Sequence, residues 1–188
     1  MATSRAGLRA LALVSLVALA AACGGGRSAA GFGWLHAGPP PATWRMVQLP
    51  SGNAALPVPT GWRVIHGDSG TVSAAELDGS GTIVGYLNAT PRQGDESLAG
   101  WARFRAEHNA DEGDRDVRSL ASGRGLRFRA GTGSCVEDTY RTSDRSYREI
   151  ACLVRGSRAS TVIVAAATPA MWPRIGPTLE RAVSSFET

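Results

Sequence analysis

The chain has 188 residues, 43% of them hydrophobic, and carries a formal net charge of +4 at pH 7. This length is that of one domain of ordinary size with an additional N-terminal segment. Arg5 and Arg9 lie in the part that we expect to be removed, which lowers the net charge to +2. This charge is too small to indicate nucleic acid as a partner.

Residues 1–22 have the pattern of a signal peptide. Arg5 and Arg9 precede an apolar run that is too short to span a bilayer as a helix. The run ends in three alanines before Cys23, which resembles the lipobox of bacterial lipoproteins, in which the cysteine thiol receives a diacylglyceryl group. This resemblance implies lipidation of Cys23, with acyl chains such as palmitate holding the protein on the outer face of the cell membrane. The alternative is an ordinary cleavage site beside an unmodified cysteine.

Residues 23–43 are predicted to form a tether between the membrane and the domain. They are rich in Gly, Ala and Pro without a period, and prolines at 39–41 stiffen the far end. The alternative is that Trp34 and Trp44 pack against the domain. We expect a loosely packed tether.

The first part of the domain, residues 44–188, is predicted to contain four short strands, a helix and two further strands. The four strands are expected at residues 46–49, 62–64, 71–77 and 82–88, where β-branched and aromatic residues lie between turn-forming segments. The helix is expected at residues 97–109, with Asp95 or Ser97 as its cap. The two further strands, 117–121 and 126–130, are expected to flank a turn at residues 122–125.

A hairpin with a two-residue loop at Ser143 and Asp144 follows. This loop sets Cys135 opposite Cys152 at a non-hydrogen-bonded pair, where two cysteines of neighbouring strands can form a disulfide. An exported domain keeps such a bond oxidised. The same register pairs Tyr140 with Tyr147, and sets Asp138 against Glu149, which should repel mildly. The alternative is two unlinked buried thiols.

The last two elements complete the predicted domain. Residues 160–168 are apolar on both faces, which is typical of a strand at the centre of a sheet covered front and back. Apolar residues then recur at helical spacing up to Phe186, in a helix that begins at Thr168 or Pro173 and bends at Pro177. Together the elements predict an α+β fold, an antiparallel sheet flanked by helices on both faces.

Several segments resemble those of PsbP-like domains. The run Val58-Pro59-Thr60-Gly61-Trp62 is similar to their opening, and the segment from Trp172 to Phe186 is similar to their closing helix. Actinobacterial lipoproteins of the LpqN type share this layout behind a lipobox. The resemblance covers about residues 54–186 and implies a PsbP-like α/β/α sandwich that acts as an accessory or binding module. Its motifs contain no catalytic signature.

A search for catalytic chemistry finds no convergent set of residues. There is no G-x-S-x-G motif, because the residues two places from Ser134 on either side are not glycine. His36, His66 and His108 are scattered, so no spacing predicts a metal site. The acidic loop at residues 110–116 does not match a calcium-binding loop. We therefore predict no catalytic residue, no metal and no cofactor.

Aromatic residues are the remaining candidates for function. Trp101, Phe104 and Trp172 either line an apolar groove that binds a ligand or anchor the two helices in the core. We expect a non-enzymatic module that binds an envelope protein or an apolar envelope ligand and needs none of its histidines. The alternative is an extracytoplasmic, hydrolase-like enzyme. A cleft in which His66 or His108 meets acidic residues would favour the enzyme.

Overall fold

The computed structural model describes residues 31–188. The predicted signal peptide, Cys23 and residues 24–30 lie outside the described residues. No helix of the described part is both long and apolar enough to cross a bilayer.

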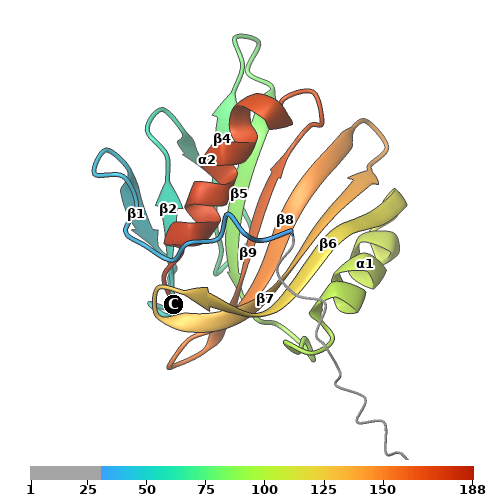
Figure 1. Cartoon of the computed structure of the whole chain (residues 1–188). Helices are drawn as coiled ribbons and strands as arrows, with labels where there is room; N and C mark the ends of the chain where they lie inside the picture. The colour runs from blue at the N-terminus through green and yellow to red at the C-terminus, as the bar shows by residue number, and fades with distance from the viewer. Residues whose placement is uncertain (1–30) are drawn as a thin grey trace, which may run out of the picture.

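The domain is built on a seven-stranded antiparallel sheet with the order β3-β4-β5-β9-β8-β7-β6 (Figure 1). Its strands are β3 (Arg63–Ile65), β4 (Val72–Leu77), β5 (Ile83–Pro91), β6 (Arg115–Phe128), β7 (Gly131–Arg141), β8 (Ser146–Arg155) and β9 (Ser160–Ala167). β1 (Arg45–Gln48) and β2 (Ala55–Val58) form a separate two-stranded sheet. The strand that is apolar on both faces, β9, is central in the large sheet, as predicted.

The two helices pack on opposite faces of the large sheet. Helix α2 (Trp172–Ser185) buries Ile175, Leu179 and Val183 in the same cluster as Cys152 and Ile163 of the sheet. Helix α1 (Trp101–Asp111) packs against the side chains that alternate with these, in a second cluster. Successive residues of a strand point to opposite faces, so each helix has its own core. The predicted α+β fold, an antiparallel sheet with helices, is confirmed.

The first helix begins later than predicted. Its first residue is Trp101 and its N-cap is Gly100, which makes no side-chain cap hydrogen bond. The Ser97 hydroxyl instead accepts the N–H of Gly100 at 3.1 Å, in a turn before the helix. The prediction that Asp95 or Ser97 caps a helix from residue 97 is therefore wrong. The Ser97 hydroxyl binds the N–H of Gly100, which precedes the helix, and not an N–H of the first helical turn.

The register of the β7–β8 hairpin is the predicted one. Cys135 pairs with Cys152, and Tyr140 pairs with Tyr147, whose ring lies 5.7 Å away between centroids. The two cysteines are joined by a disulfide, with their Cα atoms 4.0 Å apart. This short separation is that of a non-hydrogen-bonded pair.

The structure differs from the prediction in the strand before this hairpin. Residues 122–125 were expected to form a turn, but they lie within the continuous strand β6. The register with β7 shifts between Gly123 and Leu126, and Gly125 has a φ of 65°. The positive φ serves a β-bulge rather than a chain reversal, because β6 continues to pair with β7 on both sides of it.

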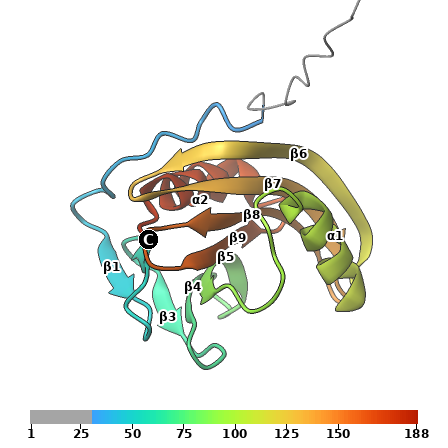
Figure 2. The same ribbon diagram turned by 90° about the horizontal axis from the view of Figure 1, so that it is seen from below.

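The predicted loose tether is wrong for residues 31–43, which pack on the domain. Phe32 is buried, and Trp34 and Leu35 pack against the same core. The backbone N–H of Gly38 donates to the Ser184 carbonyl at 3.2 Å, and Arg181 donates to the Pro39 carbonyl at 2.7 Å. Figure 2 shows this segment running along β6 and past α2 before it reaches β1. The segment covers the part of the α2 face of the sheet that α2 itself leaves open.

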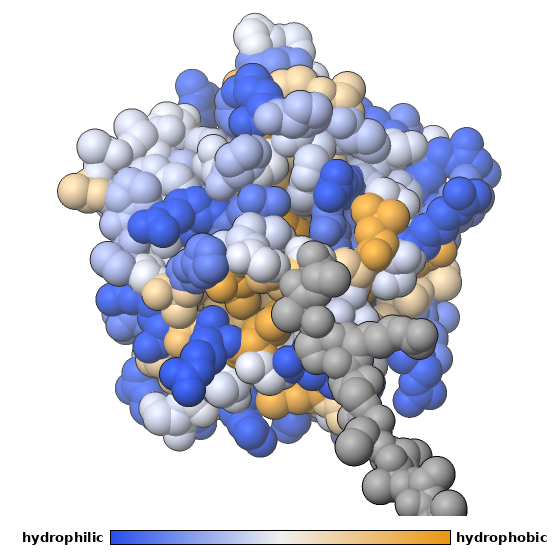
Figure 3. Space-filling model, in the orientation of Figure 1, coloured by the Kyte–Doolittle hydropathy of each residue, from blue (hydrophilic) through white to orange (hydrophobic). Residues whose placement is uncertain are grey.

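The surface of this face reflects the same packing. Apolar side chains gather toward its lower centre, and hydrophilic side chains surround them (Figure 3). Trp34, Leu35 and Trp44 are only partly buried where they contact the core. The segment thus covers this part of the core with a few large apolar side chains and without a helix.

Candidate functional site

A pocket lies on the face of the sheet that carries α1. That helix covers β6, β7 and β8, and leaves the neighbouring part of β5 and β9 uncovered. The cavity beside the helix has a volume of about 320 Å³. Its lining combines apolar, amide, hydroxyl and carboxylate groups from α1, four strands and two loops: Asp68, Thr71, Tyr86, Asn88, Thr90, Pro91, Gln93, Glu96, Trp101, Phe104, Arg105, His108, Glu112, Tyr140, Glu149, Val162 and Val164.

One wall of the pocket is an aromatic ladder along α1. The rings of Trp101 and Phe104 are stacked with centroids 5.8 Å apart, and Phe104 stacks on His108 at 5.9 Å. The spacings of three and four residues place these side chains on one side of the helix. The Trp101 indole N–H donates to the carbonyl of Ala151 at 2.8 Å, which ties the first turn of α1 to β8. Trp101 is thus a core anchor as well as a pocket residue.

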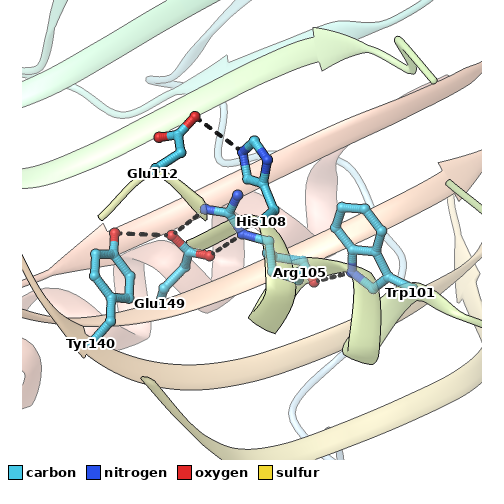
Figure 4. Close-up of polar contacts among 7 residues, drawn as sticks. Trp101, Arg105, His108, Glu112, Tyr140 and Glu149 are labelled. Carbon is cyan, nitrogen blue, oxygen red and sulfur yellow. Dashed lines mark hydrogen bonds and ion pairs between the residues drawn. The ribbon is translucent and has the colours of Figure 1, made fainter. Parts of the chain in front are cut away.

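A buried ion pair forms the end of the pocket (Figure 4). The Arg105 guanidinium donates Nε–H and Nη2–H to the two oxygens of Glu149, at 2.7 and 2.9 Å. The Tyr140 hydroxyl donates to the same carboxylate at 3.1 Å. Burial lowers the pKa of Arg105, but the Glu149 charge more than offsets this effect and raises it. Burial and then the Glu149 charge raise the pKa of Tyr140, so both groups keep their protons.

Asp138 lies beside this ion pair without a partner of its own. It is opposite Glu149 in the hairpin, and only 2% of it is exposed. Neither of its carboxylate oxygens has a hydrogen-bond partner within the described residues. Burial, and then the negative charge of Glu149, raise the pKa of Asp138 to about 7. The predicted repulsion between the two carboxylates thus contributes to the raised pKa of Asp138, and the Arg105 charge counteracts it.

The opposite wall of the pocket is polar. The Asn88 amide donates to the Ser73 hydroxyl at 2.9 Å, and this hydroxyl is 3.2 Å from that of Tyr86. The Glu96 carboxylate accepts backbone N–H groups of the loop before α1, including that of Gly94 at 2.7 Å. These bonds hold the pocket wall in shape without a bound molecule.

The structure separates the three aromatic candidates. Trp101 and Phe104 line the pocket, but Trp172 lies on the other face of the sheet, in the α2 core, with the Arg148 guanidinium 4.4 Å above its ring. The alternative of one groove formed by all three is therefore excluded, and Trp101 and Trp172 are core anchors of their helices. Helices that pack on opposite faces of a sheet cannot share a groove.

The histidines and acidic residues are also distributed. His36 and His66 are exposed in other parts of the domain, whereas His108 lines the pocket, 3.4 Å from Glu112. Within residues 31–188 no three His, Cys, Asp or Glu side chains are placed to hold a metal ion.

Sequence reasoning missed Arg105, Tyr140 and Glu149 as members of the site. The hairpin register already placed the two carboxylates Asp138 and Glu149 side by side. Alternation further puts Tyr140 on the same face as Asp138. Two carboxylates on a covered face require a cation, and this requirement was the available signal for Arg105.

Comparison with known proteins identifies the fold of this domain. No protein-family model matches the sequence, and no curated protein matches it. Among solved structures, the PsbP of the cyanobacterium Synechocystis sp. PCC 6803 (CyanoP) superposes with a TM-score of 0.55, at 15% identity over 78% of this chain and 92% of that chain. The fold is PsbP-like. The resemblance expected from the sequence is thus confirmed for the architecture.

Two other structural neighbours are more distant in shape. A Pseudomonas aeruginosa protein of unknown function matches with a TM-score of 0.49 at 16% identity, over 76% of this chain and 94% of that one. LpqN, involved in cell envelope biogenesis of Mycobacterium tuberculosis, matches with a TM-score of 0.45 at 13% identity, over 77% of this chain and 91% of that one. These two matches therefore establish neither a shared fold nor a shared function.

Proposed function

We propose that this protein is an exported accessory module, anchored to the outer face of the cell membrane by lipid on Cys23. Its PsbP-like domain binds an apolar group of an envelope ligand in the pocket beside α1 and catalyses no reaction. The extracytoplasmic location is supported by the disulfide between β7 and β8, because such bonds persist in oxidising compartments.

The observation that carries the proposal is that the charged groups at the end of the pocket are bound to one another. Both oxygens of Glu149 accept hydrogen bonds from Arg105, and one of them also accepts the Tyr140 hydroxyl. A general base needs a free lone pair near its substrate, and a general acid needs a pKa near the working pH. Arg105 and Tyr140 occupy three of the roughly four lone-pair sites of Glu149, and the raised pKa of Tyr140 makes it a poor acid. Asp138, with a pKa of about 7, is not among the residues that line the pocket, so this cluster supports shape rather than turnover.

The apolar part of the lining supports binding. Phe104 on α1 and the adjacent valines of β9, Val162 and Val164, face a cavity large enough for a small ligand or one acyl or ring group of a larger one. The polar wall around Asn88 and Tyr86 then orients the ligand through hydrogen bonds.

One observation favours the alternative, a hydrolase-like enzyme. His108 and Glu112 form a pair at 3.4 Å in the pocket, which is the meeting of histidine and acid that would indicate catalysis. However, no hydroxyl or thiol is hydrogen-bonded to His108 among the described residues, so the pair lacks a nucleophile to activate. Binding remains the better-supported function.

The proposal is tested by titrating the purified protein with a lipid extract of the cell membrane and following tryptophan emission. We expect a saturable change, because Trp101 lines the pocket. Phe104→Ala should weaken the apparent affinity roughly tenfold, through lost apolar contact.

Matched tryptophan variants locate the signal. Trp101→Phe should remove most of the emission change, whereas Trp172→Phe, on the opposite face, should retain it. No change on titration, or a change that is insensitive to Trp101→Phe and Phe104→Ala, would exclude a ligand in this pocket and favour an envelope protein as the partner. Turnover of a substrate that is lost in His108→Ala would establish the enzyme instead.

A further inference from the structure

The outer strand β6 carries several exposed arginines. Arg115, Arg118, Arg124 and Arg127 are exposed within its 14 residues. None of them forms an ion pair in the described part of the chain. The single acidic residue of the strand, Asp116, is paired with Arg141 of β7. The edge strand β6 is therefore the most basic strand of the described domain.

The same strand presents an exposed leucine. Leu120 is 52% exposed, the larger value of the two exposed large hydrophobic residues in the described domain. It lies at a register shift between Ser119 and Ala121, so it has no partner in β7. A second register shift, between Gly123 and Leu126, displaces Arg124 in the same way. Bulges re-aim side chains away from the ladder, here at the open edge of the sheet.

The N-terminal segment brings this edge close to the proposed lipid anchor. Gly31 lies so near the side chain of Ala121 in β6 that there is no room for a Cβ at this glycine. Cys23 is eight residues before Gly31, and eight residues span at most about 29 Å. A strand of this length extends only about 23 Å to either side of its centre. Every arginine of β6 is thus within reach of the surface that holds the anchor.

We infer that the edge of β6 is a membrane-binding surface, which docks on anionic phospholipid headgroups. Its arginines bind the phosphates, as basic residues near a bilayer do, and Leu120 enters the boundary between headgroups and acyl chains. The inference rests on the proposed anchor. Docking orients the domain on the membrane and leaves the pocket free, because none of its lining residues belongs to β6.

Charged residues on an edge strand also prevent aggregation, and this role alone would explain isolated arginines. It does not require an exposed leucine between them, since an apolar side chain on an open edge promotes pairing with another sheet. The combination of arginines, leucine and short connection to the anchor is what favours a lipid surface.

The experiment reconstitutes the mature protein, extracted from membranes, into vesicles of phosphatidylcholine alone or with roughly one third phosphatidylglycerol. Amide hydrogen exchange is then measured by mass spectrometry. Within the described residues β6 pairs with β7 alone, so its outward amides exchange readily unless the edge is covered. We expect exchange in β6 to slow about fivefold or more in the anionic vesicles only, and the effect to vanish in about 0.5 M NaCl.

Two variants of equal charge provide the control. Arg118→Gln/Arg124→Gln/Arg127→Gln should abolish the dependence on phosphatidylglycerol. Arg45→Gln/Arg63→Gln/Arg155→Gln removes three exposed arginines from other strands and should leave it intact. Exchange in β6 that ignores lipid composition, or an equal loss in both variants, would overturn the inference.

Failure of the anchor has a different signature. An unlipidated protein would not float with the phosphatidylcholine vesicles. In that case the edge is tested by flotation alone, which should require phosphatidylglycerol and be lost in the β6 variant but not in the control. Protein that also fails to float with anionic vesicles would refute the membrane-binding edge.

Discussion

At the scale of single residues, the α1 face shows how hydrogen-bond donors surround a carboxylate that is buried away from water. The side chain of Glu149 is 1% exposed, and three hydrogen bonds from Arg105 and Tyr140 replace its hydration. Leaving one buried charge without its partner typically costs about 3–5 kcal/mol, so these residues depend strongly on one another. Among the described residues Asp138 has no such partners, and burial and then the Glu149 charge raise its pKa to about 7.

The stability of the folded protein should therefore fall as the pH rises toward neutrality. The pKa of Asp138 is raised from 3.8 to about 7, so between these values the folded protein holds a proton that the unfolded chain has lost. This contribution is fully present below about pH 4 and is lost by about pH 7, with a total of roughly 2–4 kcal/mol. Asp138→Asn should remove it and be the more stable protein at pH 8, measured by urea denaturation at a series of pH values.

Asp95→Asn, at an exposed carboxylate in the loop before α1, is the matched control and should leave the profile unchanged. If the difference in stability between the parent and Asp138→Asn is the same at pH 4 and pH 8, Asp138 does not hold this proton.

At the scale of secondary-structure elements, the β7–β8 hairpin is the part of the sheet whose register follows most directly from the sequence. Its loop is short, so closing it sets the register of every pair up to Cys135 and Cys152. The disulfide then joins two strands that also lie between the helices. Strand β6 behaves differently, since its bulges let one strand shift its register while it continues along β7.

The disulfide should make a measurable contribution to stability. Mass mapping of peptides from the unreduced protein should find Cys135 joined to Cys152. Replacement of both by alanine should lower the free energy of unfolding by roughly 2–5 kcal/mol, because the bond restricts the unfolded chain. Free thiols at both positions in protein isolated from the envelope would contradict this prediction.

At the scale of the whole molecule, the N-terminal segment decides how the domain relates to the proposed anchor. Phe32 is buried in the α2 core, so the chain is attached to the domain from that point onward. Only the residues between Cys23 and Gly31 then remain to connect the domain to the membrane, instead of the longer tether predicted up to residue 43. With the anchor proposed at Cys23, these few residues would hold the domain close to the bilayer.

Removal of the proposed lipidation site should release the protein from the membrane. Cys23→Ser abolishes the thiol that would carry the lipid, so the variant should leave the membrane fraction or accumulate unprocessed. Ser28→Ala, outside the lipobox, should behave as the parent. Fractionation followed by immunoblotting measures both. A Cys23→Ser variant that is processed normally and remains membrane-bound would contradict the anchor.

Local features of the sequence determined much of the fold. The hairpin register followed from the length of one loop, the central position of β9 from residues that are apolar on both faces, and α2 from helical periodicity. In each case the decisive interaction is either close in sequence or repeated along one element. Such signals do not depend on knowing what lies opposite.

Tertiary structure alone decided the site. Arg105 resembles a solvent-exposed arginine in the sequence, and only Glu149, 44 residues away, makes its burial favourable. Phe32 lies in a Gly-rich segment that resembles a linker, until Gly123 and Leu126 of β6 provide the surface that it covers. Trp172 and Trp101 are equivalent as aromatic residues of helices, and the sheet between them separates their roles. A buried charge or a docked segment gains its free energy from partners distant in sequence, and these partners become neighbours only when the sheet is assembled.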